Sequence, residues 1–443
     1  MIKGFVTPKK YLFDINANCM IQLGIEVNQS KYVDKIINFL SNTVIGLHLK
    51  QDKQTDGTDI ITHTFDDPPI FKLPNSINKN QNTVQQLSEM FISNYNVPPT
   101  TRLGSIGYNN KQVVLNISHS VGDGGYFRYI IENLNSYLCN NSNSNMNFSN
   151  IPYFPNESTE IFKDFINKSP DPITVWWNQS KINRVYSKKI TKAEKISRSK
   201  PVKCKYITMR LPLHQLQNYS DTNKIHGLTD SLLTSIYIAS NVHNYSDSLN
   251  FKFDDFISMP VCVDLRRYMQ TSKIDFSICN NFSNVTPFSS ISHNDTVATV
   301  GRKIKADMFR LMKERRDIGN LKSYLKMNFT KNNEIELDPK NGCGVELTYT
   351  GPLKIKDPIT DAWMGHSLNV RSSTISLMGF AIQNERGKDE IILRLRFPPN
   401  VFDDEEAFNM SKSIEFCLKN VHNDWSIRNA IEKTCDFHKN FNF

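Results

Sequence analysis

The stretch Val113–Leu134, which reads VVLNISHSVGDGGYFRYIIENL, decides the fold of this chain. Its opening letters VVLNI place apolar residues at period two, which predicts a strand. The following run SVGDGG, residues 120–125, breaks the strand because only a tight loop tolerates so much glycine. Apolar residues then recur at the spacing of a buried helix face, namely Phe127, Ile130, Ile131 and Leu134. The stretch therefore predicts a strand, a glycine-rich loop and a helix.

Two polar residues of this stretch are candidates for chemistry. His119 lies at the end of the predicted strand, and Asp123 lies in the loop at the entrance of the helix. A histidine that a strand delivers and a rigid turn fixes is suited to the role of a general base.

Four alternatives compete with that hypothesis. His119 and Asp123 could bind a metal, but no third His or Glu lies nearby, so no metal site is predicted. A Ser-His-Asp hydrolase needs an elbow such as GxSxG, which the chain lacks. The GDGG loop could cradle phosphate, although it has neither the lysine nor the spacing of a P-loop. Finally, a histidine at a strand end could merely complete a local hydrogen bond.

Length, composition and charge set the class of the protein. The 443 residues suggest two domains of roughly 200 residues each. A hydrophobic fraction of 39% with 11% aromatic residues excludes global disorder. The net charge of +9 favours anionic partners such as a phosphorylated cofactor or an acidic carrier protein, and by itself it does not imply nucleic acid.

Cysteine usage and the N-terminus predict the compartment. The eight cysteines form no CxxC pair, which favours reduced thiols in a cytosolic protein over a disulfide scaffold or a zinc site. The N-terminal sequence MIKGFVTPKK contains no signal-type apolar run, and nowhere do eighteen apolar residues follow one another. We therefore expect a cytoplasmic protein without a membrane span.

The rest of the chain alternates between strand and helix patterns, without an internal repeat. Strands are predicted at 19–27, 60–65, 204–211, 256–265, 345–350, 374–382 and 390–397, and helices at 30–49, 84–92, 229–241, 295–325 and 403–421. Such interleaving predicts an α/β class, or mixed-sheet α+β, with large sheets in two halves.

A basic segment separates the two halves. Residues 181–205 hold ten basic residues against the single acid Glu194. We interpret it as a solvated connection, with a contact to a cofactor phosphate or a carrier protein as the alternative. The predicted organisation is an N-terminal domain at 1–185, a linker at 186–203 and a C-terminal domain at 204–443.

The loop motif is similar to a known signature. HSVGDGG at 119–125 resembles the HxxxDG motif of the acyltransferases related to chloramphenicol acetyltransferase, which include plant BAHD enzymes, alcohol acetyltransferases, polyketide-associated acyltransferases and peptide-synthetase condensation domains. VCVDLRRYM at 261–269 resembles the family's strand ending in D-x-R or N-L-R, and CNNFSNV at 279–285 resembles the asparagine-rich strand after it. DAWMG at 361–365 falls where the plant branch carries DFGWG. The resemblance covers about positions 113 to 365.

The resemblance implies two similar α/β domains with a solvent tunnel between them and His119 near its middle. Acyl donor and acceptor would enter from opposite ends. His119 would take the proton from the acceptor hydroxyl or amine as it attacks the acyl thioester, without a covalent acyl-enzyme. Acyl-CoA would be the donor and a co-substrate, with no bound cofactor.

The resemblance also assigns roles to neighbouring residues. Asp123 would be structural and pair with Arg266, while Gly124 would allow a sharp turn. A backbone N–H at Gly124, or a hydroxyl of Thr374 or Ser376, would stabilise the oxyanion.

Donor contacts are predicted on the basic helix pattern at 295–325. Lys303, Lys305 and Arg310 there could meet the phosphates of coenzyme A, with a solvated helix face as the alternative.

Two departures from the family pattern narrow the expected activity. Condensation domains show HHxxxDG, whereas Ser118 precedes His119 here, which favours O-acylation of a small alcohol over amide formation. The altered DAWMG segment argues against a standard plant-type enzyme.

We expect a monomeric acyl-CoA-dependent O-acyltransferase of secondary metabolism that takes a small-molecule alcohol or amine. The first alternative is a condensation-like or carrier-protein-dependent acyltransferase that forms an ester or amide in polyketide or peptide metabolism. The second is a non-catalytic binding module on the same scaffold.

Overall fold

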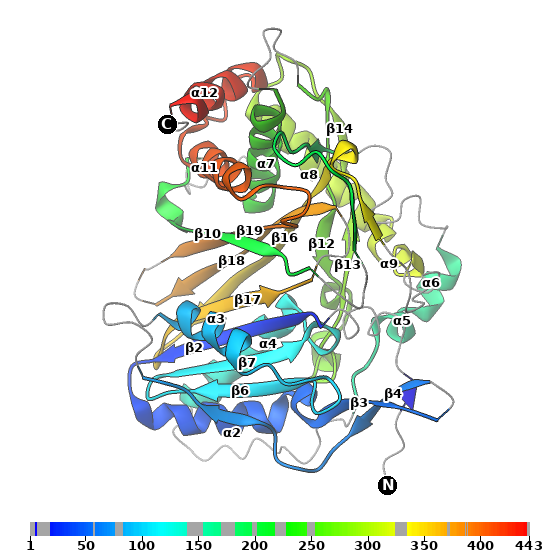
Figure 1. The fold of residues 1–443 in the computed structure, drawn as a ribbon, viewed down its shortest axis with the longest axis vertical. Coiled ribbons are helices and arrows are strands. Elements are labelled where there is room, and N and C mark those ends of the chain that lie inside the picture. The colour runs from blue at the N-terminus through cyan, green and yellow to red at the C-terminus, as the bar shows by residue number, and fades with distance from the viewer. Residues whose placement is uncertain are drawn as a thin grey trace.

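Two large β-sheets, one for each half of the chain, organise the molecule (Figure 1). A computed structural model describes residues 5–6, 18–55, 58–75, 83–139, 154–169, 182–196, 202–217, 227–245, 253–323, 335–369, 373–385, 387 and 389–440. Sheets and helices alternate as the sequence predicts, which confirms the mixed α/β class.

The N-terminal sheet has five strands in the order β17-β2-β7-β6-β5. Their bounds are β17 Ile359–Ser367, β2 Met20–Val27, β7 Gln112–Ser118, β6 Gly104–Tyr108 and β5 Ile70–Lys72. All neighbours are antiparallel except β5 and β6. A smaller sheet joins β1 (Phe5–Val6), β4 (Asp59–His63) and β3 (Leu49–Lys53).

Helices cover both faces of β7, so every residue of that strand is buried. On one face Val114 packs with Leu87 and Phe91 of α3 (Val84–Asn94). On the other, Leu115 joins the core formed with α2 (Val33–Thr43) and α4 (Gly124–Cys139). Burial on both sides explains why both faces of the strand carry apolar residues, Val114 on one face and Leu115 and Ile117 on the other.

The C-terminal sheet has the order β10-β19-β18-β16-β12-β13, with β8 pairing to β16. The bounds are β10 Lys205–Pro212, β19 Glu390–Phe397, β18 Thr374–Asn384, β16 Cys343–Ile355, β12 Val261–Asp264, β13 Phe282–Val285 and β8 Arg184–Val185. Two further pairs are β11 (Phe256–Ser258) with β14 (Phe288–Ser290) and β9 (Glu194–Ile196) with β15 (Ile335–Leu337).

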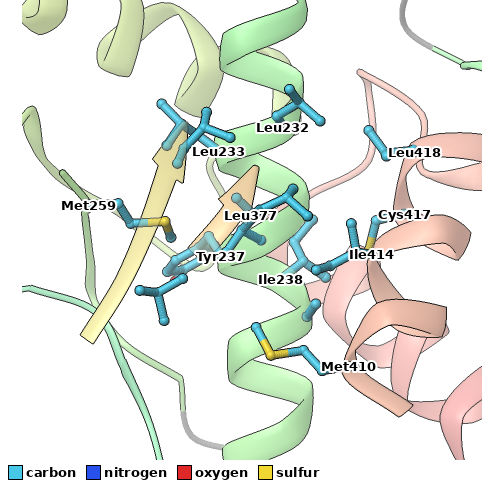
Figure 2. Close-up of a cluster of buried hydrophobic side chains, with 14 of the residues drawn as sticks. Leu232, Leu233, Tyr237, Ile238, Met259, Leu377, Met410, Ile414, Cys417 and Leu418 are labelled. Carbon is cyan, nitrogen blue, oxygen red and sulfur yellow. The ribbon is translucent and has the colours of Figure 1, made fainter. Parts of the chain in front are cut away.

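One face of this sheet carries the larger hydrophobic core. It packs against α7 (Leu228–Tyr245), α8 (Val297–Lys313), α11 (Asp404–Asn420) and α12 (Ile427–Lys439). Figure 2 shows α7 between strand and helix neighbours, with Tyr237 beside Leu377 of β18 and Ile238 beside Ile414 of α11. Because neighbours surround α7, apolar residues occur around most of its circumference.

Strand β17 ties the two halves together. It follows β16 in the C-terminal half, yet it pairs antiparallel with β2 and forms the edge of the N-terminal sheet (Figure 1). Asp361 at its start also forms an ion pair with Arg210 of β10, at 3.0 Å. In the opposite direction, β8 at the end of the N-terminal half joins the C-terminal sheet. Strand pairing thus crosses the predicted boundaries at 185 and 204, and the division into domains stays a prediction.

Several predicted elements need correction. The predicted helix 30–49 ends at Thr43, where the backbone turns extended at Val44. The predicted strand 256–265 is interrupted at Met259–Pro260, since proline cannot donate to a ladder. The helix pattern 295–325 divides into α8 and the short α9 (Arg316–Gly319), with a left-handed Arg315 between them. None of the helices in the described part of the chain is long and apolar enough to cross a bilayer.

Candidate active site

His119 is the first residue after β7 and begins a short 3-10 turn, His119–Val121. Its backbone N–H donates to the carbonyl of Cys19 at 2.7 Å, and its own carbonyl accepts from the side chain of Asn280. The imidazole ring stacks on Phe282 of β13 with 5.4 Å between ring centroids. Both halves of the chain therefore hold this partly buried side chain.

One hydrogen bond determines which nitrogen of His119 can act as a base. Its Nδ1 lies 2.9 Å from the carbonyl oxygen of Gly122. A carbonyl oxygen can only accept, so in the neutral ring Nδ1 carries the proton and Nε2 keeps the lone pair. The turn thus presents Nε2 as the proton acceptor.

The predicted pair of Asp123 and Arg266 is present and buried. Nη1 and Nη2 of Arg266 donate to Oδ1 and Oδ2 of Asp123 at 2.9 and 3.1 Å. Asp123 also accepts from the backbone N–H of Tyr126 at 2.7 Å and of Asn281 at 2.6 Å. It caps the N-terminus of α4 and joins that helix to the C-terminal half.

Arg266 is held from several sides. It donates to the carbonyl of Ile278 and, at 3.0 Å, to Oδ1 of Asp264. Burial by itself lowers the pKa of Arg266, but the carboxylates of Asp123 and Asp264 outweigh it and raise that pKa. The guanidinium therefore stays charged and fixes the loop that carries His119.

The two glycines after Asp123 are required by close approach of the halves. A Cβ at Gly124 would lie 2.5 Å from Oγ1 of Thr350 on β16, and one at Gly125 would lie 2.6 Å from Nη1 of Arg266. Neither position has room for a side chain, so the two glycines let the loop pack against β16 and the buried ion pair.

A second histidine lies near His119, and sequence reasoning missed it. His366 on β17 lines a cavity of about 10 Å³, together with Thr348 and Thr350 of β16 and Arg394 of β19. Burial lowers the pKa of His366 well below its ordinary value, and the charge of Arg394 and the proximity of His119 act in the same direction. His366 is therefore a neutral ring in the folded protein.

The predicted oxyanion donors on β18 occupy different environments. Ser376 is buried between Glu346 of β16 and Arg396 of β19, which pair at 2.9 Å, and its hydroxyl has no hydrogen-bond partner among the described residues. Thr374 is the first residue of the strand and lies beside Gly344.

The predicted donor contacts lie on α8, at the helix-covered face of the C-terminal sheet. Nζ of Lys303 pairs with Asp295 at 2.8 Å. Burial raises the pKa of Asp230 of α7, and the nearby charge of Lys305 opposes that rise only in part. Arg310 pairs with Asp307 at 2.7 Å. The described partners of these three residues thus belong to α8 and its neighbours rather than to the His119 loop.

The fold is that of condensation domains and related acetyltransferases. The first condensation domain of the calcium-dependent antibiotic synthetase superimposes with a TM-score of 0.59, at 10% identity over 97% of this chain and 99% of that one. Trichothecene 15-O-acetyltransferase from Fusarium sporotrichioides gives 0.56, at 10% identity over 94% and 95%. The epimerization domain from the third module of tyrocidine synthetase B gives 0.57, at 11% identity over 99% and 98%.

The similarity is visible in structure rather than in overall sequence. No protein-family model matches the chain, and no curated protein matches its sequence.

Proposed function

We propose that this protein is an acyltransferase that moves an acyl group from a thioester, acyl-CoA, to a hydroxyl group, with His119 as general base. The hydrogen bond from Nδ1 of His119 to the carbonyl of Gly122 carries the proposal, because it leaves Nε2 free to accept a proton. The fold shared with an acetyltransferase and with condensation domains supports it.

In the proposed reaction, Nε2 of His119 accepts the proton of the acceptor hydroxyl while the hydroxyl oxygen attacks the thioester carbonyl carbon. The tetrahedral intermediate then collapses, the carbon–sulfur bond breaks, and the departing thiolate takes the proton back from Nε2. The base is regenerated and no acyl-enzyme forms. General base catalysis of this kind contributes about 10²–10⁴ in rate.

The oxyanion of the intermediate needs hydrogen-bond donors. Gly124 is the first residue of α4, where backbone N–H groups have no partner within the helix and the helix dipole is positive. Its N–H is our first candidate donor. The hydroxyl of the buried Ser376, which has no hydrogen-bond partner in the described part of the chain, is the second candidate, while Thr374 at the end of its strand stays a weaker proposal.

Our proposal and its alternatives differ in the acyl donor that the protein uses and in the product that it forms. A condensation-like enzyme would take its acyl group from a carrier protein and could form an amide, which the similarity to condensation domains supports. A binding module on the same scaffold would show no transfer at all. The intact arrangement of His119, Asp123 and Arg266 speaks against a module that only binds.

The test follows free thiol released from acetyl-CoA and longer acyl-CoAs in the presence of mixed alcohols and amines. Wild-type protein should release thiol only with acceptor, and His119→Ala should be slower by about 10²–10⁴. His48→Ala, which changes a histidine bonded to the carbonyl of Ser41, is the matched control and should keep full activity.

Equal release by wild type and His119→Ala would remove His119 from catalysis. Release from acyl carrier protein but not from acyl-CoA would favour the condensation-like alternative. The absence of thiol release with either donor would favour the binding module.

A further inference from the structure

Arg394 is a buried arginine on the face of the C-terminal sheet that points away from the helical core. In β19 it alternates with Leu393 and Leu395, which lie in that core, so its side chain emerges on the opposite face. It is nevertheless only 6% exposed, because Trp363 of β17, the edge strand of the N-terminal sheet, packs against it.

The charge of Arg394 is weakly compensated. Among the residues that the structure describes, its nearest carboxylate oxygen belongs to Glu89, 3.8 Å from Nη2, and the side chain of Glu89 is 48% exposed. Nη1 lies 3.5 Å from the carbonyl of His366, a long hydrogen bond, and Nε has no hydrogen-bond partner among the described residues.

Two other arginines, the buried Arg266 and the half-buried Arg396, are better paired. Arg266 contacts Asp123 at 2.9 Å and Arg396 contacts Glu346 at 2.9 Å, and both of those carboxylates are themselves buried. A guanidinium with only a distant, half-exposed counter-charge is expensive to bury.

Aromatic rings fix the orientation of Arg394 without neutralising its charge. The guanidinium lies over the ring of Tyr206, 4.3 Å from the ring centroid, and 5.1 Å from that of Trp363. Burial lowers the pKa of Arg394, as expected for a cation that lacks a close anion. Stacking holds the planar group in the geometry in which arginine binds a carboxylate through two parallel hydrogen bonds.

The cavity beside Arg394 and the loop that carries His119 share one neighbouring residue, Thr350. Thr350, one of the lining residues, is also the residue that abuts Gly124. The cavity volume of about 10 Å³ admits one water-sized atom, such as a single carboxylate oxygen. A larger group requires Met364 and Met378, which also line it, to move, and methionine side chains adapt readily.

We propose that Arg394 binds a carboxylate of the acyl acceptor, so that the acceptor is an alcohol that also carries a carboxylate group. The proposal rests on the function proposed above. The phosphates of coenzyme A lie at the far end of the pantetheine arm from the thioester, so they do not reach a group beside the reacting carbon. A carboxylate there belongs to the acceptor or, as the alternative source, to a dicarboxylic acyl group.

The kinetic test compares hydroxy acids with their methyl esters as acceptors for acetyl-CoA. Wild type should prefer the hydroxy acid in kcat/KM by roughly 10- to 100-fold, the range for a hydrogen bond to a charged group. Arg394→Gln should lose that preference because KM for the hydroxy acid rises, while its rate with the esters stays the same. Arg394→Lys keeps the charge but lacks the two parallel N–H donors of a guanidinium, so its preference for the hydroxy acid should lie between those of wild type and Arg394→Gln.

Two controls exclude trivial explanations. Arg102→Gln removes another buried guanidinium, one paired loosely with the exposed Asp66 at 3.5 Å, and should keep the preference. With an ester acceptor, Arg394→Gln should leave the rate unchanged with malonyl-CoA as well as with propionyl-CoA. If Arg394→Gln lost rate with malonyl-CoA alone, Arg394 would bind a carboxylate of the donor, and the assignment to the acceptor would be overturned.

A binding measurement separates this proposal from the proposed function. In thermal shift titrations, the hydroxy acids should stabilise wild type and Arg102→Gln saturably and Arg394→Gln far less. Stabilisation without any turnover would support the carboxylate site and refute the transferase. Equal stabilisation of wild type and Arg394→Gln, with equal kinetics, would overturn the carboxylate site.

Discussion

Asp123 receives four hydrogen bonds, two from Arg266 and two from backbone N–H groups, so none of its oxygens is left for chemistry. His119 has one ring nitrogen engaged and the other available. In the function that we propose, the two residues of the motif therefore have different roles: the histidine acts on substrate, and the aspartate holds the loop in place.

Removing the carboxylate should harm stability as well as rate. Asp123→Ala leaves Arg266 buried with Asp264 as its remaining carboxylate, and breaking a buried pair on one side typically costs about 3–5 kcal/mol. Urea unfolding should show a loss of this size. Arg310→Ala, which removes an exposed arginine paired with Asp307 and Glu314, should cost about 0–1 kcal/mol. Equal losses in both variants would mean that the buried pair does not secure the fold.

His366 should make stability depend on pH. Burial lowers its pKa in the folded protein, whereas an unfolded histidine titrates near about 6.5. Below that pH the unfolded chain binds a proton that the folded protein does not, so stability falls as the pH falls. Between pH 6 and 5, wild type should lose about 1 kcal/mol more than His366→Gln in urea unfolding. If wild type and His366→Gln lost the same free energy of unfolding over this pH range, His366 would protonate freely in the folded state.

Some residues of the site were predictable and others were not. HSVGDGG predicted His119 and Asp123 because a strand, a glycine loop and a helix follow one another within one short segment. Arg394 and His366 become neighbours only when two sheets face each other, which no local pattern encodes. The signal for Arg394 was the alternation in ILRLRF, whose basic face is buried between the halves rather than solvated.

At the scale of elements, the N-terminus of α4 depends on the absence of side chains. Gly124→Ala would place a methyl group against Thr350, and such overpacking typically costs about 1–3 kcal/mol. Thr350→Ala removes the two atoms that lie 2.5 and 2.6 Å from that methyl group, so the double variant should recover part of the loss. A double-mutant cycle in urea measures the coupling, and strictly additive effects would contradict a steric cause.

Elements with a strong local period were predicted well, and β17 was not. Its sequence ITDAWMGHS mixes acidic, aromatic and glycine positions without a clear alternation, and only the DAWMG part drew attention as a motif. The strand exists because β2, more than 300 residues earlier in the chain, offers it an edge. Pairing at such a separation lies beyond any pattern within the segment.

For the whole molecule, β17 makes the two halves interdependent. Its Trp363 is 1% exposed in the finished structure, and without β17 the strand β2 would be a bare edge. We expect residues 1–203 produced alone to lack cooperative unfolding and to be cut quickly by protease, and co-expression with 204–443 to restore a folded protein.

A fusion provides the matched control for this experiment. Ser367 lies opposite Met20, so the segment 359–367 can precede residue 20 through a two-residue turn and form a hairpin with β2. This fusion should unfold more cooperatively than 1–203. A well-folded 1–203 fragment without the added strand would show that the N-terminal half is independent.

The same strand sets an order of events during synthesis on the ribosome. About 250 residues separate the end of β7 from the end of β17. At translation rates of about 5–20 residues per second, the pair of β2 and β7, once made, therefore waits roughly 12–50 s for β17. Throughout that interval β2 is paired with β7 on one side only, so the nascent chain presents an open strand edge, and a chaperone that shields this edge until β17 emerges would protect the yield of the protein.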